Sequence, residues 1–184
     1  MGFTQFFFLG CIACAALASE KAKSPSQVAA LLKTELPQLG HRNWIVVADS
    51  AYPLQTSAGI KTVLVTESQV ACVKDVLAAL ALTKHVRPHI YLDKELAFVP
   101  ENLAPGISEY RSSLTRILAG RPTETLLHED IIKRLDEAGK TFTILLIKTP
   151  HIQPYTTVFF QLECGYWSDS AEKQLRETMA KGSQ

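Results

Sequence analysis

The chain has 184 residues, of which 47% are hydrophobic and 20% are charged, and its formal net charge at pH 7 is +1. This length fits one domain with enough interior to bury a core. The near-neutral charge, without any run of basic residues, excludes nucleic acid as the expected partner, because phosphate binding needs a concentrated basic face.

The first 18 residues differ from the rest of the chain. Residues 3–18 (FTQFFFLGCIACAALA) are apolar but short for a bilayer-spanning helix, and they end in the small-x-small triplet Ala16-Leu17-Ala18. This pattern predicts a signal peptide over residues 1–18 and a mature chain that begins near Ser19. We therefore expect an extracytoplasmic protein, either periplasmic or secreted.

The same segment has two alternative interpretations. Residues 8–11 (FLGC) loosely resemble a lipobox, which would make residues 1–18 a lipoprotein signal and place a lipid on Cys11. Only in that case do we expect a membrane as a partner. The other alternative is an uncleaved hydrophobic N-terminal helix, because no Lys or Arg precedes the apolar run.

A polar linker is predicted for residues 19–26, and a helix begins within it. Ser24 is the expected N-cap, and Pro25 suits the first helical position, where its missing N–H costs nothing. Apolar residues then recur at helical spacing until Pro37 ends the helix.

The next element is a short strand with polar groups at both ends. Residues 44–48 (WIVVA) are apolar on both faces and rich in β-branched side chains, which is typical of a buried strand in a largely parallel sheet. His41 precedes this strand. Asp49 follows it, at the carboxyl end where ligands bind in open α/β sheets.

Strands and helices alternate through the rest of the chain, with a weak signal over residues 93–106. The expected strands are 60–65, 88–92, 141–147 and 155–162, and the expected helices are 66–83, 108–119, 125–138 and 169–179. The pattern predicts a single α/β domain over residues 27–165, with a mostly parallel sheet flanked by helices. Residues 166–184 form a C-terminal helical extension.

The sequence does not decide whether the cysteines form a disulfide bond. Cys11 and Cys14 lie in the predicted signal, so Cys72 and Cys164 remain in the mature chain. An exported protein can pair them, but two cysteines in a domain of this size are also common as buried apolar residues. No Cys/His spacing typical of zinc remains outside the signal.

Four polar residues near strand ends are candidates for chemistry: His41, Asp49, His151 and Tyr155. Histidine and tyrosine can act as general acids and bases, and an aspartate can fix the tautomer of a histidine. Because a strand rises about 3.3 Å per residue, His41 and Asp49 meet only through a folded-back loop or a second subunit. His128, in the first turn of a helix, is expected to be structural.

A metal site and a nucleophilic site are less consistent with these residues. His41, Asp49 and His151 form a possible two-His, one-carboxylate set, but no helix carries ligands at i, i+4 spacing, so we predict no metal. Ser50 lacks the Gly-x-Ser-x-Gly turn of a serine nucleophile.

Three segments carry a resemblance to a known family. Residues 40–53 (GHRNWIVVADSAYP) resemble the signature of the D-ribose pyranase and L-fucose mutarotase family (RbsD/FucU). Residues 154–157 (PYTT) resemble its C-terminal Pro-Tyr-Ala-Asn motif, and residues 146–151 resemble the turn after an earlier strand. The resemblance covers most of residues 24–165.

The resemblance implies an isomerase that interconverts cyclic forms of a free monosaccharide, such as ribose or fucose, without a cofactor. The predicted signal adds that this isomerase is exported, unlike the cytoplasmic enzymes of the family. It also implies a ring-shaped homo-oligomer with sites between subunits. By resemblance, His41 is the principal acid/base, Asp49 orients it or binds a sugar hydroxyl, and Tyr155 completes proton transfer. The other substrate-contacting residues are His151, Thr157 and Tyr52.

Three departures from the family pattern keep other functions open. Asn43 stands where the family usually has Asp, and Thr157 replaces an amide that would bind the sugar. Residues 151–154 are too short to contain the helix that the family normally places there, which would remove part of the site wall or alter oligomer packing. One alternative is a non-catalytic protein of the same fold that binds a sugar or another small ligand. The other is an extracytoplasmic assembly or interaction protein.

Overall fold

The computed structural model of the chain describes residues 25–182. The predicted signal peptide, Cys11 and the predicted cap Ser24 lie outside this range. The helices are α1 (Gln27–Glu35), α2 (Gln69–Ala81), α3 (Ile107–Leu118), α4 (His128–Ala138) and α5 (Asp169–Gly182), with 3-10 helices η1 (Leu36–Gln38) and η2 (Lys94–Phe98). The strands are β1 (Trp44–Ala48), β2 (Ile60–Leu64), β3 (Val86–Asp93), β4 (Thr123–Leu126), β5 (Ile144–Lys148) and β6 (Val158–Cys164).

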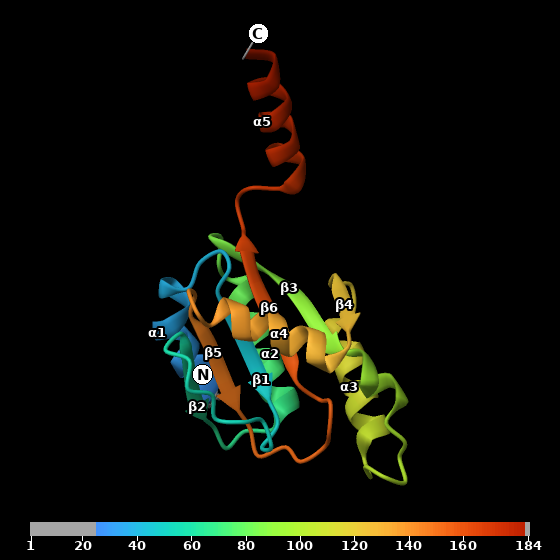
Figure 1. Cartoon of the computed structure of the whole chain (residues 1–184). Helices are drawn as coiled ribbons and strands as arrows, with labels where there is room; N and C mark the ends of the chain where they lie inside the picture. The colour runs from blue at the N-terminus through green and yellow to red at the C-terminus, as the bar shows by residue number, and fades with distance from the viewer. Residues whose placement is uncertain (1–24, 183–184) are drawn as a thin grey trace, which may run out of the picture.

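The strands of the described chain form one six-stranded sheet in the order β2-β5-β1-β6-β3-β4. Its parallel pairs are β2 with β5, β5 with β1, and β3 with β4, whereas β6 is antiparallel to both of its neighbours. Figure 1 shows β6 pointing toward α5 while β1 and β5 point the other way. The prediction of an α/β domain with a mostly parallel sheet is confirmed.

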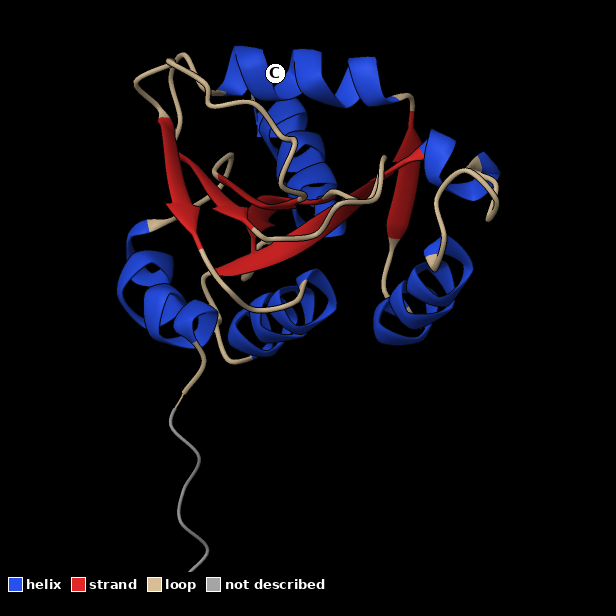
Figure 2. Ribbon diagram, turned by 90° about the horizontal axis from the view of Figure 1, so that it is seen from below, coloured by secondary structure: helices blue, strands red, loops and turns tan. Residues whose placement is uncertain are grey.

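Helices cover the two faces of the sheet unequally. Figure 2 shows several helices below the sheet and fewer above it. Alternate residues of β1 divide between two apolar clusters, because successive side chains of a strand point to opposite faces. Ile45 and Val47 pack with residues of α1, α2 and α3, and Trp44 and Val46 pack with residues of α4. Both faces of β1 are therefore buried, as its sequence predicts.

Several predicted boundaries need correction. The cap of α1 is Ser26, whose hydroxyl accepts a hydrogen bond from the backbone N–H of Ala29 at 2.9 Å. The predicted helix 125–138 begins too early, because Thr125 belongs to strand β4, which pairs with β3. The predicted strand 155–162 begins later, at Val158, because Tyr155 has a left-handed backbone conformation with φ of 56°.

The C-terminal helix α5 stands apart from the domain. Figure 1 shows it projecting beyond the end of β6, and none of its residues is buried. No helix among residues 25–182 is long and apolar enough to cross a membrane.

Candidate active site

The carboxyl edge of the sheet brings together polar residues from distant parts of the chain. Asp49 follows β1, Asp93 is the last residue of β3, and His151 lies just after β5. Tyr155 and Thr157 come just before β6, which begins at the edge where the parallel strands end. This is the edge at which open α/β sheets bind ligands.

Asp49 connects the loop after β1 to the loop before β6. Its Oδ1 accepts a hydrogen bond from the backbone N–H of Ala51 at 2.8 Å, which forms an Asx turn. Its Oδ2 accepts from the Thr157 hydroxyl at 3.4 Å. The backbone N–H of Ser50 donates to the carbonyl of His151 at 2.8 Å. The structure therefore brings the predicted residues Asp49, Thr157 and His151 together.

His151 is half-buried and lies against an aromatic ring. Its imidazole and the ring of Tyr110 have centroids 4.9 Å apart. Burial lowers the pKa of His151, while the nearby Asp49 carboxylate and the Gln153 side chain oppose this shift. The Nε2 atom is buried and forms no hydrogen bond within the described residues. This histidine is thus biased toward its neutral form, with one ring nitrogen available.

A buried polar network supports the loop that carries His151. Gln69, in the first turn of α2, is 1% exposed and donates a hydrogen bond to the carbonyl of Thr156. The Tyr110 hydroxyl donates to the same carbonyl at 2.6 Å, and the Thr149 hydroxyl donates to Gln69 Oε1 at 3.3 Å. Because these groups satisfy one another out of water, they fix the loop between β5 and β6.

Tyr52 is buried at the same edge, with 4% of its surface exposed. Its hydroxyl forms no hydrogen bond within the described chain. Burial raises the pKa of Tyr52, and the carboxylates of Asp136, Asp93 and Asp49 add to the increase. Tyr52 therefore stays protonated, and its hydroxyl lies within electrostatic range of three carboxylates.

Tyr155 lies on the open side of the site. It is 40% exposed, and its ring meets the ring of His128 edge to face with centroids 5.7 Å apart. A left-handed φ of 56° is uncommon for a bulky residue, and such conformations cluster at functional sites.

Sequence reasoning missed His128 and Asp93. His128 is the first residue of α4, and its Nδ1 lies 3.1 Å from Oδ1 of Asp93, whose side chain is fully buried. One available signal was the position of Asp93, which follows the apolar residues of β3 just as Asp49 follows β1. His128, which was expected to be structural, thus lies beside the predicted site residue Tyr155.

Asp93 and His128 shift each other's pKa in opposite directions. Burial raises the pKa of Asp93, and the hydrogen bond from His128 opposes that effect. The hydrogen bond to Asp93 raises the pKa of His128, against the effect of burial. The pKa of His128 in this pair is therefore higher than that of a free histidine, so His128 stays protonated to a higher pH.

His41 does not join this cluster within one chain. It is exposed and precedes β1, so it lies at the opposite edge of the sheet from Asp49. The five residues of β1 alone span roughly 16 Å. Because β1 lies between them, His41 and Asp49 stay at opposite ends of that strand.

The described chain contains neither a cluster of metal-binding side chains nor a disulfide bond. Within residues 25–182, no group of three or more His, Cys, Asp or Glu side chains is placed to hold a metal ion. Cys72 and Cys164 are free thiols. Burial raises the pKa of Cys72 to about 12, with Glu67 and Asp75 adding to the shift, so this thiol is unreactive at neutral pH.

Two cavities flank the cluster and give it an apolar rim. One, of about 390 Å³, is lined by Tyr155 together with Phe98 and Leu103. The other, of about 360 Å³, is lined by His151 together with Leu103 and Ile152. Phe98, Leu103 and Ile152 are each more than three-quarters exposed. The polar centre is thus bordered by exposed apolar side chains.

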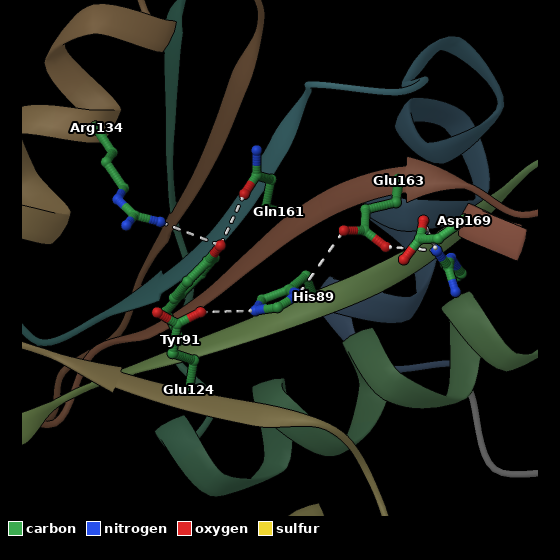
Figure 3. Close-up of polar contacts among 8 residues, drawn as sticks. His89, Tyr91, Glu124, Arg134, Gln161, Glu163 and Asp169 are labelled. Carbon is green, nitrogen blue, oxygen red and sulfur yellow. Dashed lines mark hydrogen bonds and ion pairs between the residues drawn. The ribbon is translucent and has the colours of Figure 1, made fainter. Parts of the chain in front are cut away.

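A larger cavity, of about 850 Å³, lies away from this edge, near the start of β3. There His89 lies 3.1 Å from Glu124 and 3.7 Å from Glu163 (Figure 3). Arg87 pairs with Glu163 and Asp169. The same figure shows three further hydrogen-bonded residues: Tyr91, Gln161 and Arg134. Because these polar groups have partners, we interpret the network as structural, joining the strands to the first turn of α5.

The fold and this edge define a class: a small α/β protein with an acid/base cluster at the carboxyl ends of its parallel strands. The model of the RbsD / FucU transport protein family matches residues 23–165. The chain therefore belongs to that family, and the predicted resemblance is confirmed. Helix α5 lies beyond the matched residues.

Solved structures of the family have a similar fold. The fucose mutarotase from Streptococcus pneumoniae in complex with L-fucose is 18% identical with a TM-score of 0.51, over 76% of this chain and 96% of that chain. RbsD from Bacillus subtilis complexed with D-ribose is 23% identical with a TM-score of 0.49, over 72% and 90%. A search of curated proteins found no match.

Proposed function

We propose that this protein interconverts cyclic forms of a free monosaccharide, such as ribose or fucose, by general acid/base catalysis. Family membership supports a sugar-interconverting or sugar-binding role. The observation that carries the proposal is that three of the seven buried side-chain atoms without a hydrogen bond in the described chain belong to residues of this cluster: Tyr52 Oη, Asp93 Oδ2 and His151 Nε2.

These three atoms belong to one edge of the sheet, beside Asp49. Buried polar groups are nearly always hydrogen-bonded, and an unpaired one costs about 1–3 kcal/mol. A ring that carries several hydroxyl groups is a ligand that can satisfy a phenol, a carboxylate and an imidazole together. The site therefore favours a sugar over an apolar ligand.

Ring opening of a cyclic sugar needs two proton transfers. A base removes the proton of the anomeric hydroxyl, the bond from the anomeric carbon to the ring oxygen breaks, and an acid protonates that oxygen. Closure from the open-chain aldehyde reverses both transfers. His151, whose pKa is lowered, suits the base, and His128, whose pKa is raised, suits the acid. Opposite shifts in neighbouring groups are typical of such assignments.

The remaining predicted residues bind the sugar in this proposal. Asp49 accepts a hydrogen bond from a sugar hydroxyl, and Tyr155 covers the ring from the open side. Tyr52 and Thr157 contact the substrate from the buried side.

His41 enters the proposal through a second copy of the chain. Because β1 separates it from Asp49, it reaches a site only in a neighbouring copy, so we propose a homo-oligomer. The exposed apolar rim beside Tyr155 supports this, since an interface between copies would cover it.

A second candidate is a non-catalytic sugar-binding or small-ligand-binding protein of the same fold. Thr157 favours it, because this residue is 1% exposed and its hydroxyl already donates to Asp49. One group expected to bind the sugar is thus engaged within the protein.

NMR exchange spectroscopy on free pentoses and hexoses, including D-ribose and L-fucose, tests the proposal. Wild type should accelerate exchange between cyclic forms, and His151→Ala should abolish it. His89→Gln is the matched control, because His89 lies in the separate ionic network, and it should retain activity. Sugar binding without faster exchange would favour the second candidate. If the protein neither binds sugar nor accelerates exchange, the result would favour an assembly or interaction protein.

We also propose that the protein is exported, as the pattern of residues 3–18 predicts. Mass spectrometry of the mature chain tests this. A start near Ser19 supports cleavage by signal peptidase, a lipid-modified Cys11 supports a membrane anchor, and an intact Met1 contradicts export by either route.

A further inference from the structure

The carboxylate of Asp93 is placed to control how His128 presents its ring. Asp93 ends β3, and its side chain is fully buried, whereas the His128 side chain is 31% exposed. The separation of 3.1 Å between Nδ1 and Oδ1 is a hydrogen-bond distance. One ring nitrogen of His128 is thus engaged inside the protein, while the ring lies next to the partly exposed Tyr155.

A second contact holds the backbone of the same residue. The backbone N–H of His128, at the start of α4, lies 3.1 Å from each carboxylate oxygen of Glu95. A carboxylate there satisfies a free N–H of the helix terminus and interacts favourably with the helix dipole. Glu95 and Asp93 both come from the segment that joins β3 to η2. His128 is therefore fixed through both its backbone and its imidazole.

We propose that Asp93 is a positioning residue that accepts the Nδ1–H hydrogen bond of His128 and so leaves Nε2 as the nitrogen that faces the substrate. The hydrogen bond made by one ring nitrogen decides which tautomer a histidine adopts. A carboxylate can only accept at neutral pH, so it selects the form with the proton on Nδ1. The catalytic part of this inference rests on the proposed function, but the tautomer does not.

The charges around His128 act in the same direction. They are Asp93 on β3, Glu95 on η2 and Glu129 on α4 itself, and each raises the pKa of His128, whereas burial lowers it. Asp93 in turn faces Glu95 and Asp49, which raise its own pKa. Among these groups, only Asp93 bonds to the imidazole, so only its removal should change the tautomer.

Side-chain ¹H–¹⁵N correlation NMR of the full mature chain tests the inference directly. In wild type, neutral His128 should carry its proton on Nδ1. Asp93→Ala should return it to the Nε2-protonated or mixed form, because alanine offers no acceptor to Nδ1–H, and the pKa of His128 should fall. Glu95→Gln is the matched control, because it touches only the backbone of His128, and it should leave the tautomer unchanged.

A wild-type His128 protonated on Nε2 would overturn the proposal without any variant, so the test does not depend on whether Asp93→Ala folds. An unchanged tautomer in a folded Asp93→Ala protein would overturn it as well. If the contact between Asp93 and His128 only held α4 to β3, its loss would change the melting temperature but not the tautomer of His128.

Kinetics of sugar exchange provide a second measurement. Asp93→Ala should lower kcat roughly 10–100-fold, as loss of a supporting group typically does, with a much smaller change in KM. The alkaline limb of the pH profile should move to lower pH, because His128 would lose its proton more easily. If wild type shows no exchange, the proposed function fails, while the NMR result still decides the role of Asp93.

Discussion

The substitution Tyr52→Phe separates stability from ligand binding at the site. It removes one oxygen atom and keeps the aromatic ring that packs in the core beside Trp44 and Phe159. The Tyr52 hydroxyl is buried without a hydrogen bond in the described chain, and three carboxylates lie within electrostatic range of it. Without ligand, this oxygen is therefore a cost to the folded state.

The size of the expected change in stability follows from the cost of desolvating a hydroxyl. Leaving a buried polar group unpaired costs about 1–3 kcal/mol, so the ligand-free variant should be more stable than wild type by a similar amount. For a chain of this size, each kcal/mol raises the melting temperature by about 2–4 °C. With sugar bound, the variant loses one hydrogen bond worth about 0.5–1.5 kcal/mol, so the Kd should rise roughly 2- to 10-fold.

Calorimetry measures both quantities on the same protein. Differential scanning calorimetry gives the melting temperature without sugar, and isothermal titration gives the Kd for the sugar that wild type binds best. Tyr166→Phe is the matched control, because Tyr166 is 78% exposed, and it should change neither value. If Tyr52→Phe lowers stability, or if it leaves the Kd unchanged, the hydroxyl is not an unsatisfied group that awaits a ligand.

Three further results are expected. Chains with His41→Ala and with Asp49→Ala should each be inactive in NMR exchange, but their mixture should regain activity, because mixed oligomers contain some complete sites; an inactive mixture would count against a shared site. Gly59→Ala should destabilise the protein by about 1–3 kcal/mol or more in urea unfolding, since its Cβ would collide with the backbone oxygen of Gly139. The ion pair of His128 should stabilise the protein below pH 6.5 and lose this effect as the pH rises through the raised pKa. Unfolding free energies measured on both sides of that pH check the sign.

The sequence predicted those elements whose pattern is local. The apolar run of β1 matched its structural bounds, and α2, α3 and β5 agreed within a few residues, because burial of one or both faces leaves a periodic pattern. β4 was missed because its four residues are mostly exposed and carry no such pattern. It is a strand only because β3 lies beside it.

The candidate site, too, could be predicted from the sequence only in part. Asp49, His151 and Thr157 were predicted from the motifs after β1, after β5 and before β6, and the structure brings them together. His41 was predicted from the same opening motif, but the length of β1 places it at the other edge of the sheet. A motif records which residues occur together in sequence, and it does not say on which side of a sheet they lie.

The sequence by itself determined the family, the α/β class and the polar ends of the strands. Only the tertiary structure decided that Asp93 and His128, 35 residues apart, form a pair. That contact depends on the parallel pairing of β3 with β4, which sets where α4 begins, and on the burial of Asp93. Neither leaves a local signal, because a hydrogen bond between distant residues is specified by the packing of whole elements.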